Sequence, residues 1–317
     1  MDILEKLSLA GLVPIIKVED ANDAVPLCRA LAKGGLPVAE ITFRTAAAPE
    51  AIRLVKENLP ECILGAGTVL TVEQAKQAVA SGAGYILSPG FNPKVVSYCV
   101  ENGVPILPGC SCPSDIEAAL EFGLNLVKIF PAESLGGVKF IKALSGPYVN
   151  MYFAPTGGLN ENNMLEYLAL PKVKAVGGSW MVPADAVKNK DWDKITETTQ
   201  KAVKLMLGLE LKHIGINSAS AEEALKGAKM LAAITGLPIK DGSGAAFVGS
   251  EYEFCKSKKP GTNGHIAVGT NFIARAMWHL KQQGFAFDEP ILNSEGKVNA
   301  VYLKDEICGF AVHLLQK

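Results

Sequence analysis

The sequence predicts an α/β protein built as a (β/α)8 TIM barrel, with a smaller α+β domain at its C-terminal end. Three observations predict this. Eight short apolar runs alternate with helical segments up to about residue 185, polar residues suited to catalysis stand at the ends of those runs, and a different, internally repeated pattern follows. We place the barrel at residues 1–207 and the second domain at residues 211–317.

The eight apolar runs are short and flanked by glycine or proline, as expected of parallel strands buried on both faces. Such strands are continuously hydrophobic rather than alternating, because helices cover both sides of the sheet. We predict strands at Val13–Val18, Val38–Phe43, Ile63–Val69, Tyr85–Pro89, Pro105–Gly109, Leu126–Pro131, Met151–Thr156 and Lys174–Trp180.

Segments with helical periodicity separate these strands, which gives the alternation typical of a parallel sheet. Thr71 and Ser114 stand where capping side chains are expected. A doubly wound open sheet is the alternative, but the count of eight strands and the positions of the reactive residues favour the barrel. The predicted helices include Ala21–Lys33, Pro49–Asn58, Val72–Ser81, Pro93–Asn102, Ser114–Phe122 and a last helix, Trp192–Leu207.

The composition disfavours several classes of function. The 31 basic and 32 acidic residues give a formal net charge of −1, so neither nucleic acid nor an anionic membrane is expected as a partner. No apolar stretch reaches the roughly 18 residues that span a bilayer, and the N-terminus lacks the pattern of a signal peptide. Seven scattered cysteines without a C-x-x-C pair indicate reduced thiols in a cytoplasmic protein.

Lys128 interrupts the apolar run Leu126–Phe130 in the sixth strand. A charged lysine there is costly unless it is paired, and burial favours the neutral amine, which attacks carbonyl carbons. Taken alone, a lysine on a strand is more often structural, either reaching for solvent or paired with Glu40. The residues at neighbouring strand ends, Glu40, Arg44 and Thr68, favour a catalytic lysine, because barrel active sites lie at the C-terminal ends of the strands.

The second strand ends with Glu40-Ile-Thr-Phe-Arg44, and alternate positions put Glu40, Thr42 and Arg44 on one face. Lys128 can form an imine with a keto acid, and Glu40 can carry protons. Arg44 can hold the substrate carboxylate in a bidentate fork. Together these residues supply what a 2-keto acid aldolase needs, although Glu40 and Arg44 could instead form one structural ion pair in the barrel mouth.

The last two strands end in segments that each contain a glycine pair, Pro155–Gly158 and Gly177–Trp180. Loops at this place in a barrel often bind phosphate through backbone N–H groups, and glycine permits the close approach. Such pairs form turns in most proteins. The prediction of a phosphate site therefore depends on their position at the ends of the seventh and eighth strands.

The first 205 or so residues resemble the 2-keto-3-deoxy-6-phosphogluconate (KDPG) aldolase and 4-hydroxy-2-oxoglutarate (KHG) aldolase family. The segments EITFRT, GAGTV, SPG, VKIFPAE, PTGG and GGSW carry the resemblance. It implies a lyase with Lys128 as the Schiff-base lysine and Glu40 as the general acid and base. The residues implied around the substrate are Arg44, Thr68 and Pro89 for the pyruvyl portion, and Thr156, Gly157, Gly158, Gly178 and Ser179 for the phosphate.

The same resemblance implies cleavage of KDPG to pyruvate and glyceraldehyde 3-phosphate, with cleavage of KHG to pyruvate and glyoxylate as a second activity. It also implies a homotrimer, a small 2-keto acid as the ligand, and no metal or other cofactor for this reaction. Two departures leave the choice of substrate open. Lys17 stands where many relatives carry arginine, and Gly109 is followed by Cys-Ser-Cys.

A different pattern begins at His213 and contains an internal repeat. His213-Ile-Gly-Ile opens one copy and His265-Ile-Ala-Val opens the other. Each opening precedes an alanine-rich helix and further strand signals, so we predict two βαβββ modules in one α+β domain. Three of the four histidines of the chain, with Glu253, fall at equivalent positions of the repeated strands.

This arrangement resembles the vicinal-oxygen-chelate, or glyoxalase-like, fold, in which paired βαβββ modules place four ligands in a cup. The resemblance implies a divalent metal held by His213, Glu253, His265 and His313. Three imidazoles and one carboxylate suit Zn, Fe, Ni or Mn. The alternative is a degenerate module in which these histidines only fill or end strands. His279 lies outside the set and is expected to be an ordinary surface or packing residue.

Two other functions remain open at this point. An isomerase or epimerase barrel would also bind a phosphate but would need no imine lysine. An inactive or repurposed barrel could act as a scaffold or binding module for a metal-dependent glyoxalase-like domain. The presence of Lys128, Glu40 and Arg44 together argues against an inactive barrel, because no structural need requires all three.

Overall fold

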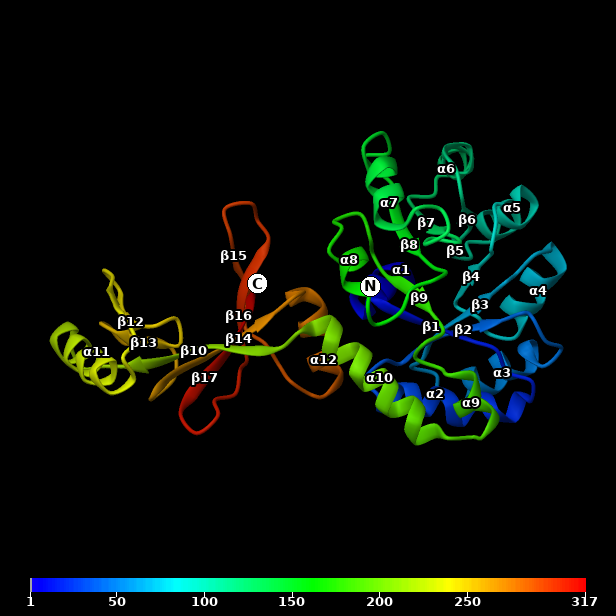
Figure 1. Cartoon of the computed structure of the whole chain (residues 1–317). Coiled ribbons are helices and arrows are strands. Elements are labelled where there is room, and N and C mark those ends of the chain that lie inside the picture. The colour runs from blue at the N-terminus through cyan, green and yellow to red at the C-terminus, as the bar shows by residue number, and fades with distance from the viewer. Residues whose placement is uncertain (1) are drawn as a thin grey trace. The chain divides into compact units, whose positions relative to one another are not determined.

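The computed structural model describes residues 2–317 and divides into two compact units, Met1–Met206 and Leu207–Lys317 (Figure 1). Each unit is described by itself. Within the described residues, the helices are all too short or too polar to cross a membrane.

The first unit is a ring of parallel strands. Hydrogen bonds link β5, β4, β3, β2, β1 and β9 in one sheet, and β6, β7 and β8 in another. An isolated bridge between Thr156 and Gly177 joins the ends of the two sheets. The strands are β1 (Leu12–Ile16), β2 (Val38–Thr42), β3 (Ile63–Gly67), β4 (Tyr85–Leu87), β5 (Ile106–Leu107), β6 (Gly109–Cys110), β7 (Leu126–Ile129), β8 (Tyr152–Pro155) and β9 (Val176–Gly178).

Strands β5 and β6 together take the place of the predicted fifth strand. They are separated by Pro108, which has no N–H group for the ladder. The carbonyl of Pro108 still accepts a hydrogen bond from the Lys128 N–H at 3.0 Å. The nine short segments therefore correspond to the eight predicted strand positions, and the sequence prediction of an α/β fold for this unit is confirmed.

Helices follow most strands and surround the ring in Figure 1. Thr71 caps its helix as predicted, since its side chain accepts the Gln74 N–H. The prediction that Ser114 caps a helix is wrong, because the helix begins one residue earlier at Pro113, whose fixed φ suits a first turn. The elements are α1 (Ile3–Ala10), η1 (Ala21–Asp23), α2 (Ala24–Lys33), α3 (Ala48–Asn58), α4 (Val72–Ala80), α5 (Pro93–Glu101), α6 (Pro113–Glu121), α7 (Gly137–Ser145), α8 (Met164–Leu168), α9 (Ala184–Lys188) and α10 (Trp192–Leu207).

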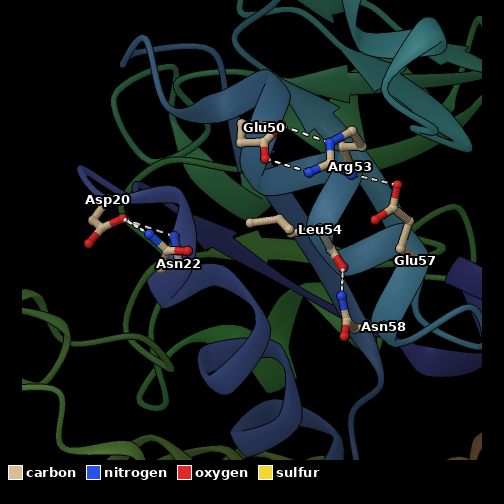
Figure 2. Close-up of polar contacts among 7 residues, drawn as sticks. All are labelled: Asp20, Asn22, Glu50, Arg53, Leu54, Glu57 and Asn58. Atoms are coloured by element: carbon tan, nitrogen blue, oxygen red, sulfur yellow. Dashed lines mark hydrogen bonds and ion pairs between the residues drawn. The ribbon is translucent and has the colours of Figure 1, made fainter.

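The outer face of α3 shows how polar side chains hold these helices. Arg53 bonds Glu50 one turn before it and Glu57 one turn after it, and Asn58 donates to the carbonyl of Leu54 (Figure 2). In the same view the Asp20 carboxylate accepts from Asn22 at the start of η1. These exposed contacts lie on the surface, whereas the opposite face of α3 buries Ala51, Ile52 and Val55 against the barrel.

The second unit is one mixed sheet with the strand order β11-β12-β13-β10-β14-β17-β16-β15. Each half consists of a strand, a helix and three strands, which is the predicted βαβββ pattern. The elements are β10 (Glu210–Asn217), α11 (Ala221–Thr235), β11 (Ile239–Asp241), β12 (Ala245–Val248), β13 (Tyr252–Cys255), β14 (Gly264–Thr270), α12 (Ile273–Gln282), β15 (Ile291–Leu292), β16 (Val298–Tyr302) and β17 (Phe310–Gln316).

Equivalent strands of the two halves meet at the centre of this sheet. Strand β10 lies antiparallel to β14, while β13 and β17 run parallel to β10 and β14 on either side. Helix α11 packs Ala224 and Ala228 against Val248 and Phe254. Helix α12 buries His279, which is therefore a packing residue and not a surface one.

Candidate functional site

Lys128 lies on β7 inside the barrel, and Glu40 lies on β2. The Lys128 Nζ is 3.4 Å from the Glu40 Oε1. Lys128 is 5% exposed and Glu40 is 1% exposed. The second carboxylate oxygen of Glu40, Oε2, has no hydrogen-bond partner among the described residues. The pair is therefore shielded from bulk water and keeps one carboxylate oxygen for a ligand or a water molecule.

Glycines on the neighbouring strand provide the room that this pair occupies. Gly67, at the end of β3, pairs with Thr42 on β2. A Cβ at Gly67 would lie 2.1 Å from the Glu40 Oε1 and 2.7 Å from its Cδ. The glycine is required here for space, because the Glu40 side chain leans across β3.

A pocket of about 210 Å³ opens over Lys128 at the C-terminal ends of the strands. Every barrel residue predicted from the sequence as catalytic or substrate-binding lines it. These residues are Glu40, Arg44, Thr68, Pro89, Lys128, Thr156, Gly157, Gly158, Gly178 and Ser179. The structure thus brings together residues that are spread over about 140 positions of the sequence.

Arg44 stands at the exposed rim of this pocket. Its Nε donates to the Thr42 Oγ1 at 3.3 Å, and the Thr42 hydroxyl donates to the carbonyl of Ile16 at 2.8 Å. The buried threonine therefore fixes the base of the guanidinium. Glu40 pairs with Lys128. Among the described contacts, none joins Arg44 to Glu40, so the alternative of a structural Glu40–Arg44 ion pair is wrong.

The backbone at the pocket rim adopts conformations that side chains rarely allow. Thr68 has a φ of 56°, in the left-handed region, although it is not a glycine. Such residues cluster at ligand-binding sites, where the surrounding structure holds them in place. Gly157 and Gly158 have φ values of 97° and 84°, which suits glycine and turns their peptide groups relative to β8.

Four pocket residues were not predicted from the sequence as site residues: Ile15, Thr42, Phe130 and Leu159. The ring centroid of Phe130 is 5.4 Å from the Lys128 Nζ. Phe130 stands two positions after Lys128 and so on the same face of the chain, which is the signal that could have found it. A second hollow of about 820 Å³ shares Ile15, Arg44 and Ser179 with the pocket and continues past Lys17.

The second unit contains a cluster of the four residues predicted as metal ligands. The His213 Nε2 lies 3.1 Å from the His265 Nε2, and the Glu253 Oε2 lies 3.3 Å from His213 and 3.1 Å from His265. One ring nitrogen each of His213, His265 and His313 falls within 4.8 Å of the others. The structure therefore brings residues from β10, β13, β14 and β17 to one face of the sheet.

Burial favours the neutral form of two of these imidazoles, His213 and His313. Burial, together with the neighbouring histidines His265 and His213, lowers the pKa of His313 to about 4, against the opposing effect of Glu253. Burial also lowers the pKa of His213, against the opposing effect of Glu253. The hydrogen bond from His265 lowers the pKa of Glu253. At neutral pH His213 and His313 are thus held neutral beside an ionised Glu253 carboxylate, and these are the forms that act as ligands.

Aromatic rings border the cluster. His313 stacks on Tyr302 with ring centroids 4.8 Å apart, and Phe247 meets His213 edge to face at 6.1 Å. Both nitrogens of His313 and the Nδ1 of His265 are buried without a hydrogen-bond partner among the described residues. Unpaired buried polar atoms are costly, so three of them in one cluster need a compensating partner.

A sequence model of the family "KDPG and KHG aldolase" matches residues 3–198. The 2-dehydro-3-deoxy-phosphogluconate aldolase of Treponema pallidum is 49% identical over 204 residues, which cover 64% of this chain and 97% of that protein. The KHG/KDPG aldolase of Escherichia coli K12 is 42% identical over 197 residues, 62% of this chain and 92% of that protein.

Solved structures give the same result. The KDPG aldolase of Legionella pneumophila, solved with pyruvate captured as a covalent carbinolamine, is 39% identical with a TM-score of 0.61. It covers 63% of this chain and 97% of its own. The Zymomonas mobilis aldolase is 38% identical with a TM-score of 0.61 and covers 64% of this chain and 96% of its own. The matched family region ends before the second unit begins.

Proposed function

The chain belongs to the KDPG and KHG aldolase family, and we propose that its barrel is a Schiff-base aldolase that cleaves KDPG to pyruvate and glyceraldehyde 3-phosphate. The observation that carries the proposal is the buried pair of Lys128 and Glu40, 3.4 Å apart, at the bottom of one pocket. Cleavage of KHG to pyruvate and glyoxylate is the proposed second activity, supported by the name of the Escherichia coli relative.

The geometry supports a mechanism in which Lys128 is the nucleophile. Its Nζ adds to the keto carbon and forms a carbinolamine, which loses water to give an imine. Glu40 then takes the proton from the C4 hydroxyl, the C3–C4 bond breaks, and its electrons pass into the imine to leave an enamine. The aldehyde departs. Glu40 returns the proton to the enamine carbon, and water hydrolyses the resulting imine to free pyruvate and Lys128.

The rim of the pocket supports the placement of the two ends of the substrate. Arg44, fixed by Thr42, supplies paired N–H donors for the carboxylate beside the reacting ketone, with Thr68 and Pro89 around it. Gly157, Gly158, Gly178 and Ser179 line the same pocket, where backbone N–H groups suit a phosphate. These parts supply every group that the reaction requires, so the barrel needs no metal.

Trapping of the imine tests the proposal. Borohydride added to the protein with pyruvate should reduce the imine to a stable adduct, which peptide mass spectrometry should locate on Lys128. Lys128→Met should form no adduct and should lose KDPG cleavage. Lys201→Gln is the matched control, since Lys201 is exposed on α10 and paired with Glu197. An adduct on another lysine, or none in folded protein, would favour an isomerase or an inactive scaffold barrel.

We infer from the family resemblance that the barrel forms a homotrimer in the cytoplasm. The free cysteines of the chain support a reducing compartment, because none is joined in a disulfide among the described residues. Light scattering coupled to gel filtration checks the assembly. A monomer at micromolar concentration would contradict the trimer and leave the aldolase proposal unaffected.

We further propose that the second unit is a glyoxalase-like, vicinal-oxygen-chelate domain that holds a divalent metal with His213, Glu253, His265 and His313. Two observations favour this function. His213, Glu253 and His265 lie 3.1–3.3 Å from one another, with a ring nitrogen of His313 within 4.8 Å of the other histidines. Buried nitrogens of His265 and His313 also lack a partner among the described residues. A metal bound there would polarise a ligand oxygen as a Lewis acid. Metal analysis of protein purified with and without air tests the proposal, and absence of any stoichiometric ion would overturn it.

A further inference from the structure

Cys255 lies beside the proposed metal ligands of the second unit and has no assigned role. It follows Glu253 by two residues on β13, so both side chains lie on the same face of the sheet. Its side chain is fully buried. In the described residues its sulfur makes one weak contact, to the carbonyl of Glu253 at 3.9 Å, which leaves the thiol without a strong partner of its own.

A glycine on the central strand lets His265 reach Cys255 across β10. Gly215 pairs with Glu253 on one side and with His265 on the other. A Cβ at Gly215 would lie 2.0 Å from the His265 Cε1 and 2.4 Å from its Nε2, so the imidazole lies directly over the glycine. One donor atom each of Glu253, Cys255 and His265 consequently falls within 4.8 Å of the others.

The histidines provide an independent sign that a ligand belongs in this cluster. His265 is 4% exposed and its Nδ1 has no partner, while His313 is 7% exposed and both of its ring nitrogens lack one. The three histidines form a second donor group that shares His265 with the group of Cys255. His265 therefore stands where a carboxylate, a thiol and two further imidazoles meet.

We propose that Cys255 is an additional ligand of this cluster, which makes it a thiolate-containing centre for a borderline or soft cation such as Zn²⁺ and not for Mg²⁺ or Mn²⁺. The inference deepens the metal site proposed for the second unit and rests on it. Thiolate and imidazole ligands favour zinc and softer ions, whereas carboxylate and carbonyl ligands suit magnesium and manganese. On binding, the S–H bond of Cys255 is replaced by a metal–sulfur bond, and its proton passes to solvent.

The spacing of the donors fits one ion. Zinc holds nitrogen at about 2.0–2.1 Å and sulfur at about 2.3 Å in a tetrahedron, so two bound donors lie roughly 3.3–3.6 Å apart. The donors of Glu253, Cys255 and His265 already lie within 4.8 Å of one another, so they can close around an ion with small movements of side chains. Because Glu253 and His265 are 3.1 Å apart, they can bind one ion at adjacent positions.

Cobalt(II) binding to the metal-free full-length protein tests the inference. The wild-type protein should develop the near-ultraviolet charge-transfer absorption of a cobalt–thiolate bond. Cys255→Ser should lose that absorption while still binding cobalt through the histidines. Its zinc affinity should fall by more than the roughly 10–100-fold typical of a change next to a ligand. Cys308→Ser is the matched control, since Cys308 is exposed in the same unit, and it should keep the absorption.

The possible results separate the two proposals. Cobalt bound without the thiolate absorption, or the same absorption in Cys255→Ser, would overturn the role of Cys255 and leave the metal centre standing. Failure of wild-type protein to bind cobalt or zinc would overturn the metal centre itself. If Cys255→Ser does not fold, zinc-edge X-ray absorption of the wild-type protein decides, because one sulfur neighbour supports the inference and only nitrogen and oxygen neighbours refute it.

Discussion

The barrel pocket and the histidine cluster use the same structural device for different chemistry. In each, a glycine on one strand leaves space for the reactive side chain of the next strand. Gly67 makes room for Glu40 in the barrel, and Gly215 makes room for His265 in the second unit. Neither glycine has a positive φ, so the residue is needed for the space it leaves and not for its conformation.

The electrostatics of the two sites differ. The barrel buries an amine beside a carboxylate, Lys128 with Glu40. A proton therefore has only a short distance to travel between these groups and a substrate bound over them. The cluster gathers three imidazoles around one carboxylate, and burial favours the neutral form of His213 and His313. The interior of a closed ring of strands suits a nucleophilic lysine, because burial there favours its neutral amine. The face of an open sheet suits a group of side chains that converge on one metal ion.

The largest expected effect concerns proton transfer by Glu40 in the barrel pocket. Glu40→Gln keeps the size of the side chain and removes the proposed base, so kcat/KM for KDPG should fall about 10²–10⁴-fold. Lys128 should still be trapped by borohydride with pyruvate, because the nucleophile remains. Steady-state kinetics and adduct mapping check both points. Glu50→Gln on the outer face of α3 is the control (Figure 2). Unchanged turnover in Glu40→Gln would move the base to another group.

The next effect tests the space at Gly67. In Gly67→Ala the new Cβ would overlap Glu40 at 2.1 Å, and the buried carboxylate cannot swing into solvent. Displacement of a catalytic group by about 1 Å can cost roughly 10²-fold in rate. Gly90→Ala is the matched control, since no atom lies within 4 Å of its Cβ position. A Gly67→Ala enzyme with wild-type kcat and a normal melting temperature would show that Glu40 has room to move.

The barrel could be predicted from sequence because its signals are local. Each strand is a short apolar run, and Lys128 stands out against Leu126–Phe130. What could not be predicted depends on contacts between distant strands. The left-handed Thr68 and the support of Arg44 by Thr42 and Ile16 arise only when the ring closes, and nothing in the local pattern encodes them.

The second unit was harder to predict in detail. Its repeat gave the βαβββ pattern and the positions of the histidines, but not the register that puts Glu253, Gly215 and His265 in one row. Cys255 was missed because a cysteine in a strand is usually a small apolar residue. Cys255 on β13 lies near His265 on β14 because Gly215, on the strand between them, has no side chain to separate the two.

A third prediction extends the comparison to Gly215. Gly215→Ala should push the His265 ring off β10, because the new Cβ would lie 2.0 Å from the His265 Cε1. Displacing a ligand through its neighbour typically costs about 10–100-fold in metal affinity. Competition with a zinc-sensitive dye measures the change. Gly244→Ala in the same unit has open space at its Cβ position and should bind as the wild type does. Equal affinity in both variants would mean that His265 is not a ligand.

The smallest expected effect concerns the rim of the barrel pocket, where Arg44 is exposed and solvent weakens each contact. Arg44→Lys keeps the positive charge but loses the paired N–H donors of the guanidinium, which Thr42 orients. KM for KDPG should therefore rise roughly tenfold, with a smaller change in kcat. Arg53→Lys on α3, whose guanidinium pairs with Glu50 and Glu57 on the outer surface, should leave KM unchanged. If Arg44→Lys instead lowered kcat as much as Glu40→Gln does, with KM unaltered, Arg44 would take part in bond cleavage and the division between a buried reacting pair and an exposed binding rim would fail.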